Sequence, residues 1–188
     1  MNKTVKKLTL SAMFLAIGLV LPFLTMQIPQ FGRMMLPMHI PVILCGLICG
    51  WKFGLPVGAI LPLMRSALFT TPPMFPMAIS MAFELAAYGF IVGILYERSR
   101  WHCIIALYRS MIVAMLAGRV VWGFAMFALL GGFGGNFTWQ WFMAGAFIEA
   151  FPGIIVQLVL IPAIMVALRR AGLVQFHRER KGKSTVDN

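Results

Sequence analysis

Long apolar stretches, each followed by a short polar or proline-containing segment, succeed one another along the chain. Most are close to the length of about 20 residues that an α-helix needs to cross the hydrocarbon core of a bilayer. The pattern predicts six helices, over about residues 5–24, 36–50, 54–69, 77–95, 104–131 and 139–168. The second and third are short and contain prolines, and the fifth begins near Ile104 or Arg109. We therefore expect a bundle of six transmembrane helices.

Three segments between these helices contain residues that interrupt helices. Residues 27–33 and 70–76 contain prolines, and residues 131–136 are rich in glycine. Proline lacks a backbone donor and restricts the residue before it, so residues 70–76 are expected to form a loop. All three segments fall at the same end of the predicted bundle. They are suited to close over a site, and they are ordinary turns if no pocket lies beneath them.

The composition supports the membrane class. Of 188 residues, 61% are hydrophobic and 11% are charged, whereas a soluble domain is about 45–50% apolar with about a quarter of its residues charged. We expect an all-α integral membrane protein with a single membrane domain over residues 1–188. The first apolar stretch lacks a small-residue cleavage site and is long enough to span, so we expect it to remain as a helix. Cys45, Cys49 and Cys103 have no metal-binding or redox spacing, so neither a metal nor a cofactor is predicted.

The basic residues indicate the orientation. The net charge is +11, but the lysines and arginines gather at helix ends and in the tail over residues 169–188, which is not a nucleic-acid-binding pattern. Thirteen of them fall at one end of the predicted bundle, and Arg33 alone falls in the loops at the other end. Cytoplasmic segments carry such an excess. Both termini are therefore expected in the cytoplasm, which requires an even number of spans.

Four charged residues lie within the apolar stretches, namely Arg65, Glu84, Arg119 and Glu149. A charge at the centre of a bilayer costs about 2.5–3.5 kcal/mol on insertion scales, so such residues usually face a partner or a cavity. At about 1.5 Å per residue, all four lie outside the inner third of the membrane, and His39 lies near the same outer end. This shared depth predicts a polar pocket that opens outward. The alternative is that pairs such as Arg65 with Glu84, or Arg119 with Glu149, only hold helices in register.

Aromatic residues accompany these charges. Trp122 follows Arg119 by three residues, so it lies on nearly the same helix face, well inside the membrane. Trp139 and Trp141 belong by default to the aromatic belt at a membrane interface. Trp122 is therefore the stronger candidate to stack on a ligand.

Small residues recur at a spacing of four, at Ala12 and Ala16 and again at Gly54 and Gly58. This spacing lets membrane helices approach closely, for internal packing or for a partner. The chain contains no P-loop, no HExxH motif and no nucleophile with a positioned base. We expect no catalytic residues and no enzyme activity. A pocket without an energy source implies a partner.

With these features the chain resembles the substrate-binding (S) components of energy-coupling factor vitamin transporters. The resemblance covers six helices, the basic cytoplasmic ends, the length and the motif formed by Ala12 and Ala16 in the first helix. It implies that these two alanines dock on a transmembrane coupling subunit, which works with two ATPase subunits. It also implies a multi-pass protein of the bacterial cell membrane that takes up a water-soluble vitamin from outside.

Residues 37–46, 61–66, 81–85 and 117–123 look like the subgroup usually assigned to pantothenate. An arginine fits the carboxylate of such a vitamin through two parallel hydrogen bonds. Glu84 can accept from a ligand hydroxyl or amide, or it can neutralise an arginine. The four intramembrane charges sum to zero, so they do not by themselves demand an anion. The candidate substrate-binding residues are Arg119, Trp122, Glu84, Arg65, His39, Asn136 and Glu149.

Other readings compete with pantothenate uptake. The same scaffold in the resembling family serves pyridoxine, hydroxymethylpyrimidine, niacin and folate. A membrane enzyme needs paired acid and base groups or metal ligands, which Glu84, Glu149 and His39 supply only at spacings that match no motif. A channel needs polar residues along its whole length, and a stand-alone transporter usually shows an internal repeat. Neither pattern is present in this sequence.

Overall fold

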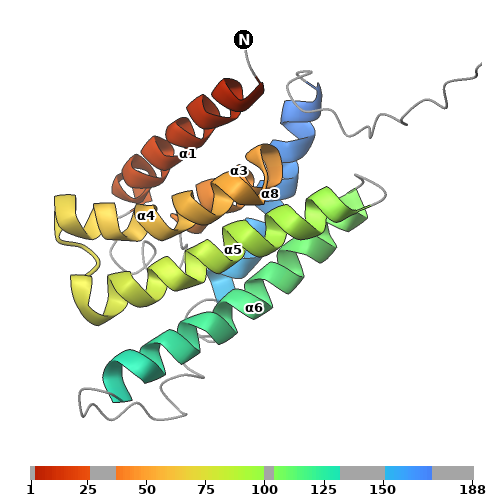
Figure 1. Ribbon diagram of the computed structural model, residues 1–188. Coiled ribbons are helices and arrows are strands. Elements are labelled where there is room, and N and C mark those ends of the chain that lie inside the picture. The colour runs from red at the N-terminus through yellow and green to blue at the C-terminus, as the bar shows by residue number, and fades with distance from the viewer. Residues whose placement is uncertain (1–2, 26–36, 100–103, 132–150, 171–188) are drawn as a thin grey trace, which may run out of the picture.

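The computed structural model of the chain describes residues 3–25, 37–99, 104–131 and 151–170. All regular structure within these ranges is helical, which confirms the all-α class. The helices pack side by side as a bundle (Figure 1). In chain order they are α1 (Lys3–Thr25), α3 (His39–Cys49), α4 (Trp51–Phe69), η1 (Met74–Ala78), α5 (Ile79–Arg98), α6 (Ile104–Gly131) and α8 (Phe151–Arg170).

Five of the described helices are long and apolar enough to cross a bilayer, and α3 is a shorter apolar helix. With 11 residues, α3 is only about 16 Å long at 1.5 Å per residue, about half of a hydrocarbon core of about 30 Å. The prediction of six full spans therefore stays a prediction. Residues 139–150 of the predicted last helix lie outside the described ranges, and the described part begins at Phe151.

The segment predicted as a loop over residues 70–76 is partly helical. Residues 70–73 are non-helical, and Thr70 ends α4 in the left-handed conformation (φ 58°), with its N–H donating to the carbonyl of Ser66 at 2.9 Å. A π-type turn, η1, then leads into α5, although Phe75 within it is extended. Pro76 is accommodated because the first turn of a helix leaves backbone N–H groups without a partner, so its missing donor is not needed there.

A single residue, Gly50, joins α3 to α4. Its φ of 93° and ψ of 172° lie in a region that is essentially restricted to glycine. Its N–H donates to the carbonyl of Gly46 at 3.1 Å, and its carbonyl accepts from the N–H of Gly54 at 3.0 Å. The two helices therefore reverse direction within one residue and form a tight antiparallel pair.

Glycines bring α3, α4 and α5 into backbone contact. A Cβ atom placed on Gly46 would come within 2.7 Å of the carbonyl oxygen of Gly89, and one on Gly54 would come equally close to the same oxygen. Gly58 faces the backbone of Leu85 in the same way. The seam predicted at Gly54 and Gly58 is thus used inside the molecule, where it places α4 directly beside α5, and Gly46 does the same for α3.

The core centres on α3, in which every residue except Ile48 is buried. Its side chains pack with Leu61 of α4, Leu85 of α5 and Met111 of α6. By contrast, α1 lies at the edge of the bundle (Figure 1) and buries only one side. Its exposed large apolar residues are Val5, Leu8, Met13, Ile17, Val20 and Phe23.

The described ends of the chain lie together. Figure 1 shows that the start of α1 and the end of α8 lie at the same end of the bundle, with the end of α5 and the starts of α4 and α6. We call this the basic end, because its described residues include Lys3, Lys6, Lys7, Lys52, Arg98, Arg109, Arg169 and Arg170.

Candidate functional site

The carboxylate of Glu84 joins side chains from three helices. Its Oε1 atom lies 3.2 Å from Nη1 of Arg119 on α6 and 3.7 Å from Nε2 of His39 on α3. It also accepts a hydrogen bond of 3.0 Å from the hydroxyl of Tyr88, one turn further along α5. All four side chains are buried. We call these four residues the Glu84 cluster.

Local structure explains why these residues meet. His39 is the first residue of α3, and Glu84 lies in the second turn of α5. Both positions are in the half of the bundle away from the basic end. Gly46 of α3 lies against the backbone of Gly89, which brings the two helices close together. Arg119 reaches the same carboxylate from the middle of the 28-residue α6.

The cluster contains more hydrogen-bonding groups than its members satisfy. Within the described ranges, both ring nitrogens of His39 and Nε of Arg119 are buried without a hydrogen-bond partner. A buried polar group left unpaired costs about 1–3 kcal/mol, so native structures usually supply a partner for it. The ring of His39 also lies 5.2 Å from the ring of Tyr88, centroid to centroid. The cluster is thus a buried polar centre with donors and acceptors to spare.

Arg65 does not join this cluster. Its Nη1 donates to the carbonyl of Leu19 on α1 at 2.9 Å, and its guanidinium lies 5.1 Å from the ring centroid of Phe23. The predicted alternative in which Arg65 pairs with Glu84 is not what the structure shows, because Glu84 pairs with Arg119.

The other predicted residues are distributed as follows. Trp122 is buried one turn from Arg119 and packs with Met126 and Leu130 of the same helix. Ala12 and Ala16 are both exposed on α1. Asn136 and Glu149 lie outside the described residues, so neither they nor the predicted pair of Arg119 with Glu149 is placed.

Two large buried polar residues, Tyr88 and Gln157, were not among the predicted site residues. Tyr88 follows Glu84 by four residues, so helical spacing alone would have placed it on the same face. Gln157 of α8 is 2% exposed, and its Nε2 atom has no hydrogen-bond partner within the described ranges. In the sequence, Gln157 is a single amide side chain within an apolar stretch, and a search restricted to charged residues does not find it.

The chemistry available to the Glu84 cluster is that of binding. One carboxylate, one guanidinium, one imidazole and one phenol offer charge and directed hydrogen bonds. In the described part of the chain, no three His, Cys, Asp or Glu side chains gather in a way that could hold a metal ion. A buried pair such as Glu84 and Arg119 contributes little net stability, yet removing one partner costs about 3–5 kcal/mol. The cluster therefore links α3, α5 and α6 through one carboxylate.

We compared the chain with families, curated proteins and solved structures. The family model described as "ECF transporter, substrate-specific component" matches residues 6–165. No curated protein and no solved structure gave a match. The matched range begins in α1, ends in α8 and includes all four residues of the Glu84 cluster.

Proposed function

The chain belongs to the substrate-specific components of ECF transporters, and from this premise we propose that it captures pantothenate at the Glu84 cluster. Members of this family are membrane-embedded subunits of transporters rather than enzymes, and they bind small vitamin-type substrates. The proposal assigns the vitamin and the residues that hold it.

The observation that carries the proposal is the set of unused polar atoms around Glu84. A buried arginine and a buried histidine each keep ring or guanidinium nitrogens without a partner in the described ranges. Pantothenate has a carboxylate, two hydroxyls and an amide, which match these groups in kind. Its carboxylate would accept from Arg119, and a hydroxyl would pair with His39. A ligand that satisfies these atoms removes a cost of about 1–3 kcal/mol for each of them.

The start of α3 adds to the preference for an anion. The helix begins at His39 without a side-chain cap on its first turn, and His39 itself contacts Glu84. The N-terminus of a helix carries about half a positive charge. This field and the guanidinium of Arg119 together offset the charge of Glu84, so the balance at the cluster favours a ligand carboxylate.

The assembly that we propose follows from α1 and from the basic end. Ala12 and Ala16 are exposed on a helix of which only one side packs in the bundle, which leaves this face open to a coupling subunit. That subunit, with two ATPase subunits, would supply the energy that this chain lacks. The basic end is proposed to face the cytoplasm of a bacterial cell, so that the Glu84 cluster lies in the outer half of the membrane.

Isothermal titration of the purified protein tests the substrate and its main ligand. We expect pantothenate to bind the unaltered protein and the variant Arg98→Gln, whose altered residue is exposed at the basic end. Arg119→Lys should weaken binding by about 100-fold, because lysine keeps the charge but loses the two-pronged geometry that arginine gives to a carboxylate. Thermal unfolding of each variant separates a loss of binding from a loss of folding.

Two results would contradict the proposal. If pantothenate produces no heat of binding while pyridoxine, hydroxymethylpyrimidine, niacin or folate binds tightly, pantothenate is not the substrate. Undiminished pantothenate binding by a folded Arg119→Lys protein would reject the assigned residue instead.

A further inference from the structure

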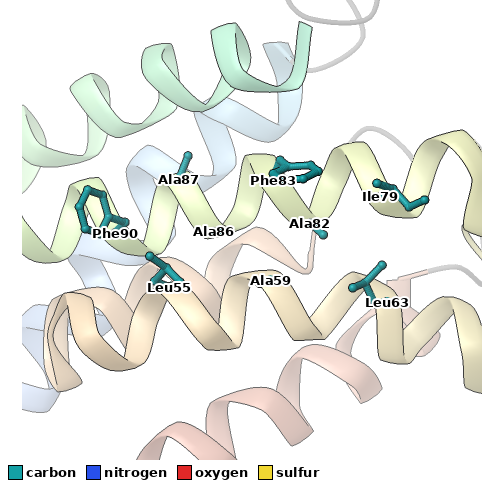
Figure 2. A pocket seen from close by; sticks show the side chains of 9 residues that line it. All are labelled: Leu55, Ala59, Leu63, Ile79, Ala82, Phe83, Ala86, Ala87 and Phe90. Carbon is teal, nitrogen blue, oxygen red and sulfur yellow. The ribbon is translucent and has the colours of Figure 1, made fainter. Parts of the chain in front are cut away.

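An apolar groove runs along the outside of the bundle between α4 and α5 (Figure 2). On α4 it is lined by Leu55, Ala59 and Leu63, and on α5 by residues that include Phe83, Ala86 and Phe90. Every lining side chain is a hydrocarbon, and Phe83 is 57% exposed. The groove therefore faces the membrane and contains no member of the Glu84 cluster.

The dimensions of the groove select its occupant. From Leu55 to Leu63 it extends about 12 Å at 1.5 Å per residue, close to one leaflet of a hydrocarbon core of about 30 Å. Its volume is about 510 Å³. This length and the purely hydrocarbon lining suit an extended acyl chain.

A cation stands at one end of the groove. Lys52 is exposed and lies three residues before Leu55, and helical spacing places it on the same face as Ala59 and Leu63. Its Nζ lies 5.7 Å from the ring centroid of Trp51. The ring of Trp51 in turn packs edge-on against Phe90, with centroids 5.6 Å apart. The lining of the groove is therefore continuous with an aromatic ring and a lysine at the basic end.

The charge around this end is positive overall. Arg98 ends α5, and Lys7 also lies at the basic end. The acidic Glu97 sits against Gly50, where the amino group of Lys7 is also close. Tryptophan and lysine are the residues that anchor a membrane protein at the level of the lipid headgroups. Lys52 is thus placed to meet a phosphate whose hydrocarbon chain lies below it.

We propose that the groove between α4 and α5 binds an anionic phospholipid, with an acyl chain against Ala59 and Ala86 and its phosphate beside Lys52. The groove supplies the affinity for the chain, and Lys52 supplies the preference for a negative headgroup. The basic end faces the leaflet in which anionic lipids are concentrated if it is cytoplasmic. The proposal does not depend on which vitamin the Glu84 cluster receives.

Native mass spectrometry of the full-length protein tests this site. The protein in detergent is mixed with equal amounts of phosphatidylglycerol and phosphatidylcholine that carry the same acyl chains. We expect one retained lipid, with phosphatidylglycerol preferred about five-fold, the effect of about one lysine near an anionic surface. Ala59→Phe fills the groove and should abolish retention of both lipids. Lys52→Gln should retain both lipids equally.

Ala163→Phe is the matched control, because Ala163 is an exposed alanine on α8, away from the groove. It should retain lipid as the unaltered protein does. If Ala59→Phe does not fold, Ala87→Leu fills part of the same groove from α5 with a smaller side chain. Lipid retention that survives a groove-filling substitution overturns the site, and equal retention of the two lipids by the unaltered protein overturns the headgroup. If a groove-filling variant still retains lipid but no longer binds the coupling subunit, the groove is a docking surface for a protein and not a lipid site.

Discussion

Glu84 is where the physical chemistry of single residues has the largest effect in this protein. A carboxylate with 2% exposure is tolerated in an apolar bundle because a guanidinium and a phenol pair with it directly, and an imidazole lies close by. These partners differ in how directly they interact with the carboxylate. Arg119 and Tyr88 are held directly by Glu84, whereas His39 lies 3.7 Å away and makes no hydrogen bond within the described ranges. His39 is therefore the member of the cluster whose polarity the fold uses least.

This difference can be measured by replacing His39 with phenylalanine, which keeps an aromatic ring. Because no hydrogen bond within the described ranges is lost, we expect the free energy of unfolding to change by less than about 1 kcal/mol. Pantothenate binding should fall at least ten-fold, because a buried ligand hydroxyl loses its partner at a cost of about 1–3 kcal/mol. Denaturation and titration calorimetry of the purified variant measure the two quantities.

Glu84→Gln is the contrasting variant. It leaves the buried guanidinium of Arg119 without its counter-charge, so unfolding should become easier by about 3 kcal/mol. Glu97→Gln, at an exposed carboxylate of the same helix, should change stability by no more than about 0.5 kcal/mol. A large loss of stability in His39→Phe, matching that of Glu84→Gln, would show that His39 supports the fold rather than the ligand.

Among the elements, α1 and α3 differ most. Nearly all of α3 is buried, and its one glycine, Gly46, lies against Gly89 of α5. Only one side of α1 is buried, through residues such as Phe14 and Gly18, and Ala12 and Ala16 are exposed. An exposed apolar helix with small residues at a spacing of four suits a second helix that must come close.

Replacing both Ala12 and Ala16 with leucine tests the use of α1. We expect the double variant to bind pantothenate normally, because neither residue lies in the Glu84 cluster, but to lose co-purification with the coupling subunit and the ATPases. Bulky side chains would keep the helix backbones apart. Ala163→Leu on α8 adds equal bulk at another exposed position and should assemble fully. Intact assembly of the double variant would show that the partner docks elsewhere.

At the scale of the whole molecule, the placement of charge at the two ends indicates how the bundle sits in the membrane. The described ends of α1 and α8 lie together at the basic end, while α4 and α5 meet their connecting segment at the other end (Figure 1). An excess of lysine and arginine marks the cytoplasmic side of membrane proteins. The segment near Thr71 is therefore expected outside the cell.

Cysteine labelling in intact cells tests this orientation. In a protein with Cys103 changed to serine, Thr71→Cys should react with a membrane-impermeant maleimide, and Arg170→Cys should react only after the cells are opened. Both positions are exposed, and the native Cys45 and Cys49 are buried. Labelling of Arg170→Cys in intact cells would place the basic end outside and would reverse the depth assigned to the Glu84 cluster.

The sequence predicted the helical class, and it singled out His39, Glu84 and Arg119, which the structure brings together. Apolar length and buried charge each have one dominant physical cause. It did not predict how the charges pair. Arg65 and Arg119 look alike in an apolar stretch, and only the packing of α1 sends Arg65 to the carbonyl of Leu19 while Arg119 reaches Glu84. Tyr88 was missed because a phenol in a membrane helix is usually explained by packing or by the interface.

The exposure of α1 also affects how this protein can change over generations. Substitutions at exposed positions such as Ala12 and Ala16 cost an isolated fold no more than about 0.5 kcal/mol in most proteins. Selection on them then comes from outside the molecule. Phe14 and Gly18, on the buried side of the same helix, are constrained by the chain itself. A lineage descended from this protein in which Ala12 and Ala16 vary while Phe14 and Gly18 stay unchanged would be one that has lost or exchanged its coupling partner.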